Sequence, residues 1–239
     1  DAITVGEKLA RDSRFFLEGG AKNIARRDGM GTTLLSFAEE TQRIPDVYFQ
    51  AVGSGTGAIA AWENAQRLEA DGRFGSNNMR VYVAQNAPFT LIADSWKAGS
   101  RELVSLSPEV GRRNAEMVLA KVLANRKPPY SLAGGLYDVL TASNGACLTC
   151  SNDELLYSML LFRNLEVYDL LPAACCTVSS LINAVHSGLV KKDEFIMLNC
   201  TGGGSMASMS MGYKLKEPDL IVSPDVDEDE LIRDVNRLF

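Results

Sequence analysis

The chain has 239 residues, of which 46% are hydrophobic, so it is long enough to build one large domain or two small ones around a substantial core. Its formal net charge is -6 and no basic stripe runs along it, so nucleic acid is not an expected partner. No apolar run approaches the roughly 20 residues of a membrane-spanning helix, and no signal peptide is recognisable. We therefore expect a cytoplasmic protein without a membrane partner.

Cysteine and histidine content limits the chemistry further. Five cysteines without a secretory signal favour reduced thiols over a disulfide framework. The single histidine, His186, argues against a metal site built from several histidines and leaves a serine hydrolase only one candidate base. We predict no metal site. The sequence opens at Asp1 with a helical pattern over 3–9 that has nothing before it to pack on, so we expect a piece of a longer protein.

Along the chain, short apolar runs alternate with longer segments of helical period, which is typical of a parallel sheet with helices on both faces. We predict an open, doubly wound, mostly parallel α/β fold. The expected strands cover 14–17, 47–52, 80–84, 145–149 and 195–199. Amphipathic helices are expected over 57–70 and 110–123, packed against the sheet. Residues 1–15 are interpreted as the end of a small domain or a linker, and 16–239 as one large domain.

Two helix starts are marked by capping residues. Ser107 precedes Pro108, which predicts an N-cap followed by proline at the first helical position. Ser151 stands three residues before Glu154, the spacing of a capping box. These signals concern structure alone.

The first candidate site is the loop Gly53, Ser54, Gly55, Thr56 and Gly57, between an apolar strand and a helix. Glycines let backbone N-H groups approach a ligand, and a helix start adds unpaired N-H groups and a positive dipole end. Anion binding is the favoured interpretation, and a plain strand-to-helix turn stays open.

Two familiar phosphate motifs do not fit this loop. A nucleotide P-loop needs lysine and a hydroxyl residue after the last glycine, where this chain has Ala58 and Ile59. The dinucleotide motif needs a different glycine spacing and an acidic residue after the next strand, where this chain has Gln85 and Asn86.

A second glycine turn, Thr201 to Gly204, follows the last predicted strand. Taken alone, a flexible turn is the favoured interpretation. Paired with the first loop, however, it can hold the far end of one ligand. The phosphate would then lie at the first loop and a heteroaromatic nitrogen at Thr201.

Longer stretches of the sequence carry a family resemblance. They are 18–23 (EGGAKN), 26–32 (RRDGMGT), 48–57 (YFQAVGSGTG), 127–130 (KPPY), 134–138 (GGLYD), 171–174 (LPAA) and 199–204 (NCTGGG). Together they resemble the threonine synthases and the related cysteate synthases, which are pyridoxal-phosphate enzymes of the fold-type II architecture. The resemblance covers nearly the whole chain.

This resemblance implies roles for both glycine motifs. The cofactor lies between a small and a large domain, with its phosphate in the loop Gly53 to Gly57 and its pyridine nitrogen hydrogen-bonded to Thr201. A neutral hydroxyl leaves that nitrogen unprotonated, which suits replacement and elimination at the substrate's β or γ carbon. The family's catalytic lysine belongs to a Ser-Phe-Lys-like segment that Lys8, Lys22 and Lys97 do not match. We therefore expect that lysine upstream and expect this chain alone to be inactive.

The residues of these motifs resemble those of cysteate synthases more closely than those of threonine synthases. A cysteate synthase converts O-phosphoserine and sulfite to cysteate and phosphate in coenzyme M biosynthesis. The alternatives are a threonine synthase acting on O-phosphohomoserine, or a non-catalytic module that binds a phosphate ligand. Leu171 stands where many threonine synthases have an acidic residue. The expected partners are a small amino-acid phosphate ester and, in the full-length protein, further copies of the same chain.

The cysteines and methionines are interpreted as structural. Cys147 and Cys150 are three apart in a predicted strand and so face opposite sides of the sheet. Cys200 is expected in the core. Met206, Met209 and Met211 are expected to fill an irregular gap.

Overall fold

The computed structural model describes residues 2–214 and 216–239, which divide into two compact units. The larger unit is Gly20–Ala207, and the smaller one joins the segment up to Gly19 with the segment that starts at Ser208. The predicted division of the whole protein into a small domain up to residue 15 and a large domain from residue 16 stays a prediction. Both candidate motifs lie in the larger unit.

The larger unit is built on a four-stranded parallel sheet, which confirms the predicted fold class. In spatial order its strands are β3 (Ala146–Cys150), β2 (Arg80–Asn86), β1 (Val47–Ala51) and β4 (Ile196–Leu198). Tyr48 of β1 pairs with Val81 on one side and with Met197 on the other. The two central strands are almost entirely buried, as strands covered on both faces should be.

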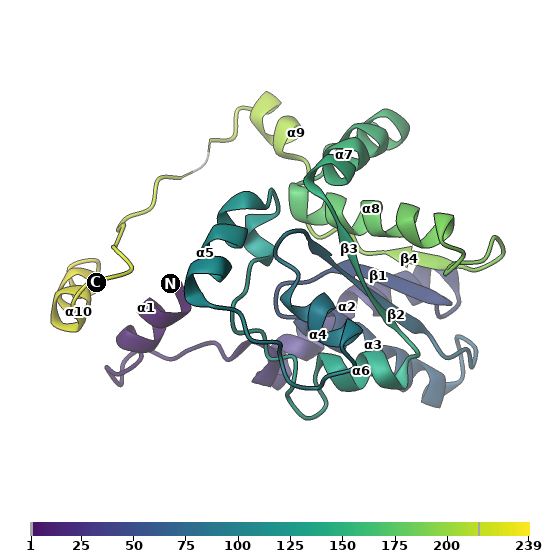
Figure 1. The fold of residues 1–239 in the computed structure, drawn as a ribbon, viewed down its shortest axis with the longest axis horizontal. Helices are drawn as coiled ribbons and strands as arrows, with labels where there is room; N and C mark the ends of the chain where they lie inside the picture. The colour runs from purple at the N-terminus through teal and green to yellow at the C-terminus, as the bar shows by residue number, and fades with distance from the viewer. Residues whose placement is uncertain (1, 215) are drawn as a thin grey trace. The chain divides into compact units, whose positions relative to one another are not determined.

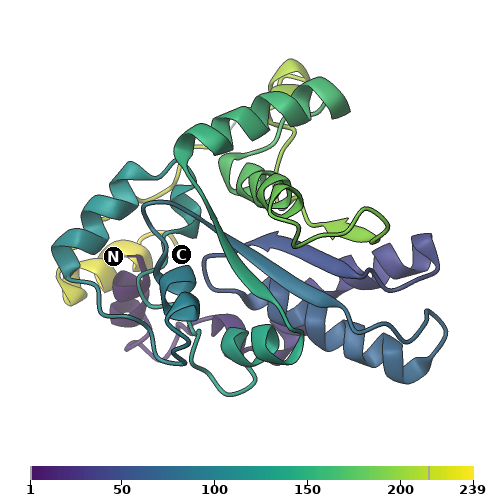
Figure 2. The same ribbon diagram turned by 45° about the vertical axis from the view of Figure 1, so that its right-hand side comes forward.

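Helices cover both faces of this sheet (Figure 1). On one face lie α2 (Ile24–Thr41), α3 (Thr56–Asp71), α4 (Leu91–Lys97) and α6 (Leu136–Ala142). On the other face lies α8 (Pro172–His186), with α7 (Asn152–Glu166) packed on its outer side. Figure 2 shows the green helices α7 and α8 again across the sheet from the blue helices α2 and α3.

Side chains of β1 alternate between the two faces. Tyr48 and Val52 join the core beside α3, whereas Val47 and Phe49 join the core beside α8. Gln50 therefore shares the α3 face with Tyr48, because residues two apart in a strand point the same way.

The predicted helix caps are confirmed. Ser107 accepts a hydrogen bond from the Val110 N-H at the start of α5 (Pro108–Met117), with proline at the first position. Ser151 and Glu154 form a complete capping box at the start of α7. His186 is the last residue of α8.

Two predictions of local secondary structure are wrong. Residues 14–17 form no strand, and Phe16 is 87% exposed. The helix expected over 110–123 ends at Met117, and a separate turn of 3-10 helix, η2, follows at Lys121–Leu123. Between the two, the Leu119 and Ala120 N-H groups donate to Oδ1 of Asn86 at the end of β2, which competes with continuing the helix.

The methionine prediction is also wrong. Met206 and Met209 lie on α9 (Ser205–Ser210), a six-residue helix, and Met211 follows it. All three side chains are more than half exposed, so they fill no gap in the described structure.

The remaining elements are short or lie in the smaller unit. The larger unit also contains a 3-10 turn, η1 (Gly20–Lys22). In the smaller unit, α1 (Ala2–Leu9) lies beside α10 (Glu228–Asn236), where Lys8 Nζ donates to the Val226 carbonyl at 2.7 Å and Arg11 pairs with Glu228.

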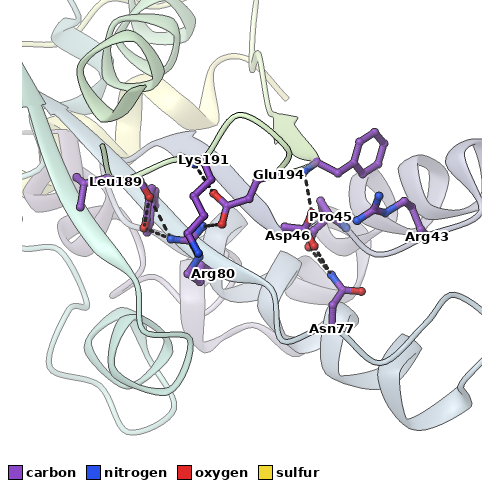
Figure 3. A network of polar contacts seen from close by, with 10 residues as sticks. Arg43, Pro45, Asp46, Asn77, Arg80, Leu189, Lys191 and Glu194 are labelled. Carbon is purple, nitrogen blue, oxygen red and sulfur yellow. Dashed lines mark hydrogen bonds and ion pairs between the residues drawn. The ribbon is translucent and has the colours of Figure 1, made fainter. Parts of the chain in front are cut away.

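A network of polar side chains joins the amino-terminal ends of β1, β2 and β4 (Figure 3). Asp46, just before β1, accepts hydrogen bonds from the Phe195 N-H at 2.7 Å and from Arg43 at 2.9 Å. Arg80, at the start of β2, pairs with Glu194 at 2.6 Å and donates to the Leu189 carbonyl. These groups bind one another and so fix the relative positions of three strands.

Candidate functional site

A cavity of about 550 Å³ opens at the opposite, carboxyl-terminal ends of β1 and β4. Ligands of open α/β sheets usually bind at these ends of the strands. Its walls come from α2, the end of β1, the start of α3, α7 and the turn after β4. The lining residues are Met30, Thr33, Gln50, Gly57, Phe162, Tyr168, Leu170, Asn199, Cys200, Thr201, Gly202 and Gly203.

The two glycine motifs predicted from the sequence meet in this cavity. Gly57 of the first loop lines the cavity, as do Thr201, Gly202 and Gly203 of the second. Gly53, Ser54, Gly55 and Thr56 stand just before Gly57 and are not among the lining residues.

The first loop ends in an uncapped helix start. Gly55 is the N-cap of α3, with a φ of 83° in the left-handed region that favours glycine, and it makes no side-chain cap. The first helical hydrogen bond runs from the Ile59 N-H to the Gly55 carbonyl at 3.0 Å. The N-H groups of the first turn before Ile59 have no acceptor within the helix, so this end is suited to an anion.

Hydroxyl groups accompany these N-H groups. Ser54 Oγ and Thr56 Oγ1 lie 2.9 Å apart and share one hydrogen bond. The Thr56 N-H makes only a long contact of 3.4 Å to Ser54 Oγ. The loop therefore keeps donor capacity beside the helix start.

The second turn is held by backbone hydrogen bonds. The Gly204 N-H donates to the Asp169 carbonyl at 2.8 Å, and the Leu171 N-H donates to the Gly202 carbonyl at 3.0 Å. Leu171 thus lies directly against this turn. The Thr201 side chain is exposed, and in the described parts of the chain its hydroxyl has no hydrogen-bond partner. It is available to a ligand in the cavity.

A chain of three hydrogen-bonded polar side chains, Asn199, Tyr48 and Gln50, borders the cavity and was not predicted. Asn199 Nδ2 donates to Tyr48 Oη at 2.6 Å, and Tyr48 Oη donates to Gln50 Oε1 at 2.7 Å. Tyr48 is fully buried, and this burial raises its pKa well above the ordinary range, although the bond from Asn199 acts in the opposite direction. A signal was present in the sequence, since Gln50 is a polar residue inside an apolar strand and must find a partner or a ligand.

The cysteines are mainly structural. Cys147 and Cys150 belong to the cores on opposite faces of the sheet, as predicted. Cys200 packs against the core beside α8 but also lines the cavity, so the expectation of a purely core position is incomplete. Burial raises the pKa of the Cys200 thiol, which keeps it in the neutral form.

No group of side chains suited to a metal ion occurs among residues 2–214 and 216–239.

Solved structures share the architecture of this chain. Serine racemase from Dictyostelium discoideum aligns over 74% of this chain and 49% of its own length, with a TM-score of 0.52 and 16% identity. L-serine ammonia-lyase from Rhizomucor miehei aligns over 77% and 55%, with a TM-score of 0.53 and 15% identity. At such identities the likeness concerns the fold alone, which is that of the fold-type II enzymes.

The family follows from the sequence match. The model of the pyridoxal-phosphate dependent enzymes matches residues 1–202, and the chain belongs to this family. This confirms the predicted family and its cofactor, pyridoxal phosphate.

Among curated relatives, the chain is similar to proteins named cysteate synthase. It is 49% identical to that of Methanoculleus marisnigri over 208 residues, covering 85% of this chain and 48% of the relative. It is 43% identical to that of Methanosarcina barkeri over 235 residues, covering 97% and 56%. The chain therefore spans about half the length of the curated relatives it matches.

The residues around the cavity fit pyridoxal phosphate. The uncapped start of α3 offers N-H donors to a dianionic phosphate, and the missing side chain of Gly57 leaves space there. Thr201, which lines the same cavity, has a free hydroxyl in the described structure that would suit a ring nitrogen.

Proposed function

We propose that this chain is the cofactor-binding part of a cysteate synthase-like enzyme, which converts O-phosphoserine and sulfite to cysteate and phosphate. The observation that carries the proposal is the meeting of the α3 start and the Thr201 turn in one cavity, in a chain 41% to 49% identical to relatives named cysteate synthase. In this reaction the bond from the substrate β carbon to the phosphate oxygen breaks, and a bond from that carbon to the sulfite sulfur forms.

Residues Gly53, Ser54, Gly55, Thr56 and Gly57 would hold the cofactor phosphate. The N-H groups at the start of α3 supply hydrogen bonds and the positive end of the helix dipole. The hydroxyls of Ser54 and Thr56 add donors beside them.

Thr201 would hold the other end of the cofactor through its pyridine nitrogen. Bound pyridoxal phosphate withdraws electrons from the substrate α carbon, and a neutral partner at the ring nitrogen moderates that withdrawal. Thr201 would also orient the ring, because it lines the same cavity as Gly57 at the start of α3.

The proton-transferring group would come from outside this chain. The described lining residues include no lysine, histidine or carboxylate. This agrees with the interpretation that the catalytic lysine stands in a segment upstream of Asp1 in the full-length protein, and that this chain alone is inactive.

The remaining assignments belong to the same proposal. Residues 1–15 would end a small domain and 16–239 would form the large domain. The full-length protein would be a cytoplasmic homo-oligomer that acts on an amino-acid phosphate ester. Among the described residues, no helix is long and apolar enough to cross a membrane.

The decisive assay measures phosphate release by the full-length protein from O-phosphoserine with and without sulfite, and from O-phosphohomoserine. We expect release from O-phosphoserine only when sulfite is present. Release from O-phosphohomoserine to give threonine would instead identify a threonine synthase.

A labelling experiment locates the lysine and separates an enzyme from a non-catalytic binding module. The full-length protein is treated with pyridoxal phosphate and borohydride, and the labelled peptide is identified by mass. We expect one labelled lysine outside this chain. Specific labelling of Lys8, Lys22 or Lys97 would contradict the assignment, and the absence of any specific label would favour the binding module.

A further inference from the structure

The Gln50 side chain lies in the wall of the cavity with half of its amide unused. Gln50 is only 6% exposed, yet it lines the cavity together with Gly57. Its Oε1 accepts the bond from Tyr48, whereas its Nε2 donates to no protein atom in the described parts of the chain. Buried amide groups are nearly always hydrogen-bonded, so an unused donor at a cavity points to a ligand.

We propose that Gln50 Nε2 donates a hydrogen bond to a phosphate oxygen of the cofactor at the start of α3, with Asn199 and Tyr48 as positioning residues that orient the amide. This inference rests on the proposed function, because it takes pyridoxal phosphate as the ligand. It adds a side chain from within β1 to the backbone and hydroxyl donors of the glycine loop.

Hydrogen counting fixes the direction of the amide. A tyrosine hydroxyl carries one proton and accepts at its oxygen. Since Asn199 Nδ2 already donates to Tyr48 Oη, the single proton of Tyr48 is directed to Gln50 Oε1. The amide group of Gln50 is thereby held with Nε2, and both of its protons, left for another acceptor.

The burial of Tyr48 keeps this arrangement in place. Desolvation raises the pKa of Tyr48, so the hydroxyl remains protonated and continues to donate. Asn199 is further held by its own backbone, whose N-H donates to the Phe49 carbonyl at 2.9 Å. The polar chain is therefore anchored on both β1 and the end of β4.

The position of the amide matches the anion site. A side-chain carbon on Gly57 would lie 2.6 Å from Gln50 Nε2 and 2.7 Å from Oε1, so the amide lies directly against the first turn of α3. A ligand atom at this place has to accept hydrogen bonds from Nε2 and from the helix N-H groups together. A phosphate oxygen meets both requirements, because it is anionic and accepts several bonds.

The test compares two ligands in the full-length protein, pyridoxine 5'-phosphate and pyridoxine, which lack the aldehyde and form no covalent bond with lysine. Calorimetry gives a dissociation constant for each, and their ratio is the phosphate preference. In the Gln50→Met variant, which keeps the size but removes the donor, we expect the phosphate preference to fall about tenfold or more, with pyridoxine affinity nearly unchanged. Gln50→Glu should reduce it further, because it places a carboxylate beside the phosphate.

Two further variants separate binding from folding. Tyr48→Phe removes the proton that orients the amide and should lower the phosphate preference by a smaller factor than Gln50→Met. Gln85→Met is the matched control: Gln85 is a buried amide near the end of β2 that accepts from the Ile92 and Ala93 N-H groups and does not line the cavity. It should lower stability and leave the phosphate preference unchanged.

The possible results are distinct. Equal weakening of both ligands by Gln50→Met, or no weakening of either, would overturn the role of Gln50. A wild-type protein without any phosphate preference would instead overturn the anion site at α3 and with it the proposed function.

Discussion

The two ends of the same parallel sheet use their polar groups in opposite ways. At the amino-terminal ends of the strands, Asp46 and Arg80 are bound to partners within the protein (Figure 3). At the carboxyl-terminal ends, Gln50, Thr201 and Gly57 line a cavity, and Gln50 Nε2 and the Thr201 hydroxyl have no partner in the described structure.

One end of the sheet therefore carries polar groups that stabilise the fold, and the other end carries polar groups that are available to a ligand. A polar group that already has a partner stabilises the fold and has little left for a ligand, whereas an unpartnered group at a cavity costs stability until a ligand binds. Changes at the amino-terminal end should therefore alter the free energy of unfolding, and changes around the cavity should alter ligand affinity.

The largest stability effect is expected from Arg80→Met in the full-length protein. The variant removes the partner of Glu194, whose side chain is only 17% exposed, and should lower the free energy of unfolding by about 2 kcal/mol. Denaturant unfolding measures this change, and the phosphate preference should not move. Arg73→Met is the matched control, because the Arg73 side chain in its ion pair with Asp71 is 74% exposed, and its effect on the free energy of unfolding should be much smaller. A large loss of phosphate preference in Arg80→Met would contradict the claim that residues at the amino-terminal end of the sheet affect stability and not ligand binding.

The opposite result is expected from Thr201→Val. The exposed hydroxyl has no partner in the described structure, so the free energy of unfolding should change by no more than about 0.5 kcal/mol. Pyridoxine affinity should fall about tenfold, because the ring nitrogen loses its partner. An unchanged affinity for pyridoxine would contradict the role of Thr201.

A third variant, with a smaller effect on stability, tests whether ligand affinity depends on the residues that line the cavity or on any residue at the carboxyl-terminal end of the sheet. Ser151 follows β3 at its carboxyl-terminal end but caps α7 and does not line the cavity. Ser151→Ala should lower the free energy of unfolding by about 1 kcal/mol and leave both ligand affinities unchanged. Altered affinities would show that the whole edge of the sheet contributes to binding.

The same cap should show a pH dependence. Hydrogen bonds, chiefly from the Ser151 backbone N-H, lower the pKa of Glu154 in the folded protein. Its contribution to stability is therefore present above the ordinary pKa of glutamate and is lost as the pH falls through the lower, folded-state value. Comparing the wild type with Glu154→Gln across this acidic range measures the contribution.

Local patterns were sufficient for most of the fold. The buried run of β1 and the caps at Ser107 and Ser151 depend on neighbouring residues, and all were predicted. The end of α5 was not, because it depends on Asn86, which is distant in sequence and accepts from the Leu119 and Ala120 N-H groups.

The residues of the candidate site also fall into those that a local sequence motif predicts and those that only the folded structure brings to the site. Gly57 and Thr201 belong to recognisable glycine motifs and were proposed from the sequence alone. The role of Tyr48 appears only once the strand order places Asn199 beside it. Phe162 and Tyr168 reach the cavity through the packing of α7 and the turn that follows it, which no local pattern indicates.

The most direct test of the central claim is a crystal structure of the full-length protein with pyridoxal phosphate. The account predicts the phosphate within hydrogen-bond distance of the Gly57 N-H and Gln50 Nε2, and the pyridine nitrogen beside the Thr201 hydroxyl. A phosphate bound away from the start of α3, or a ring nitrogen facing another residue, would contradict it.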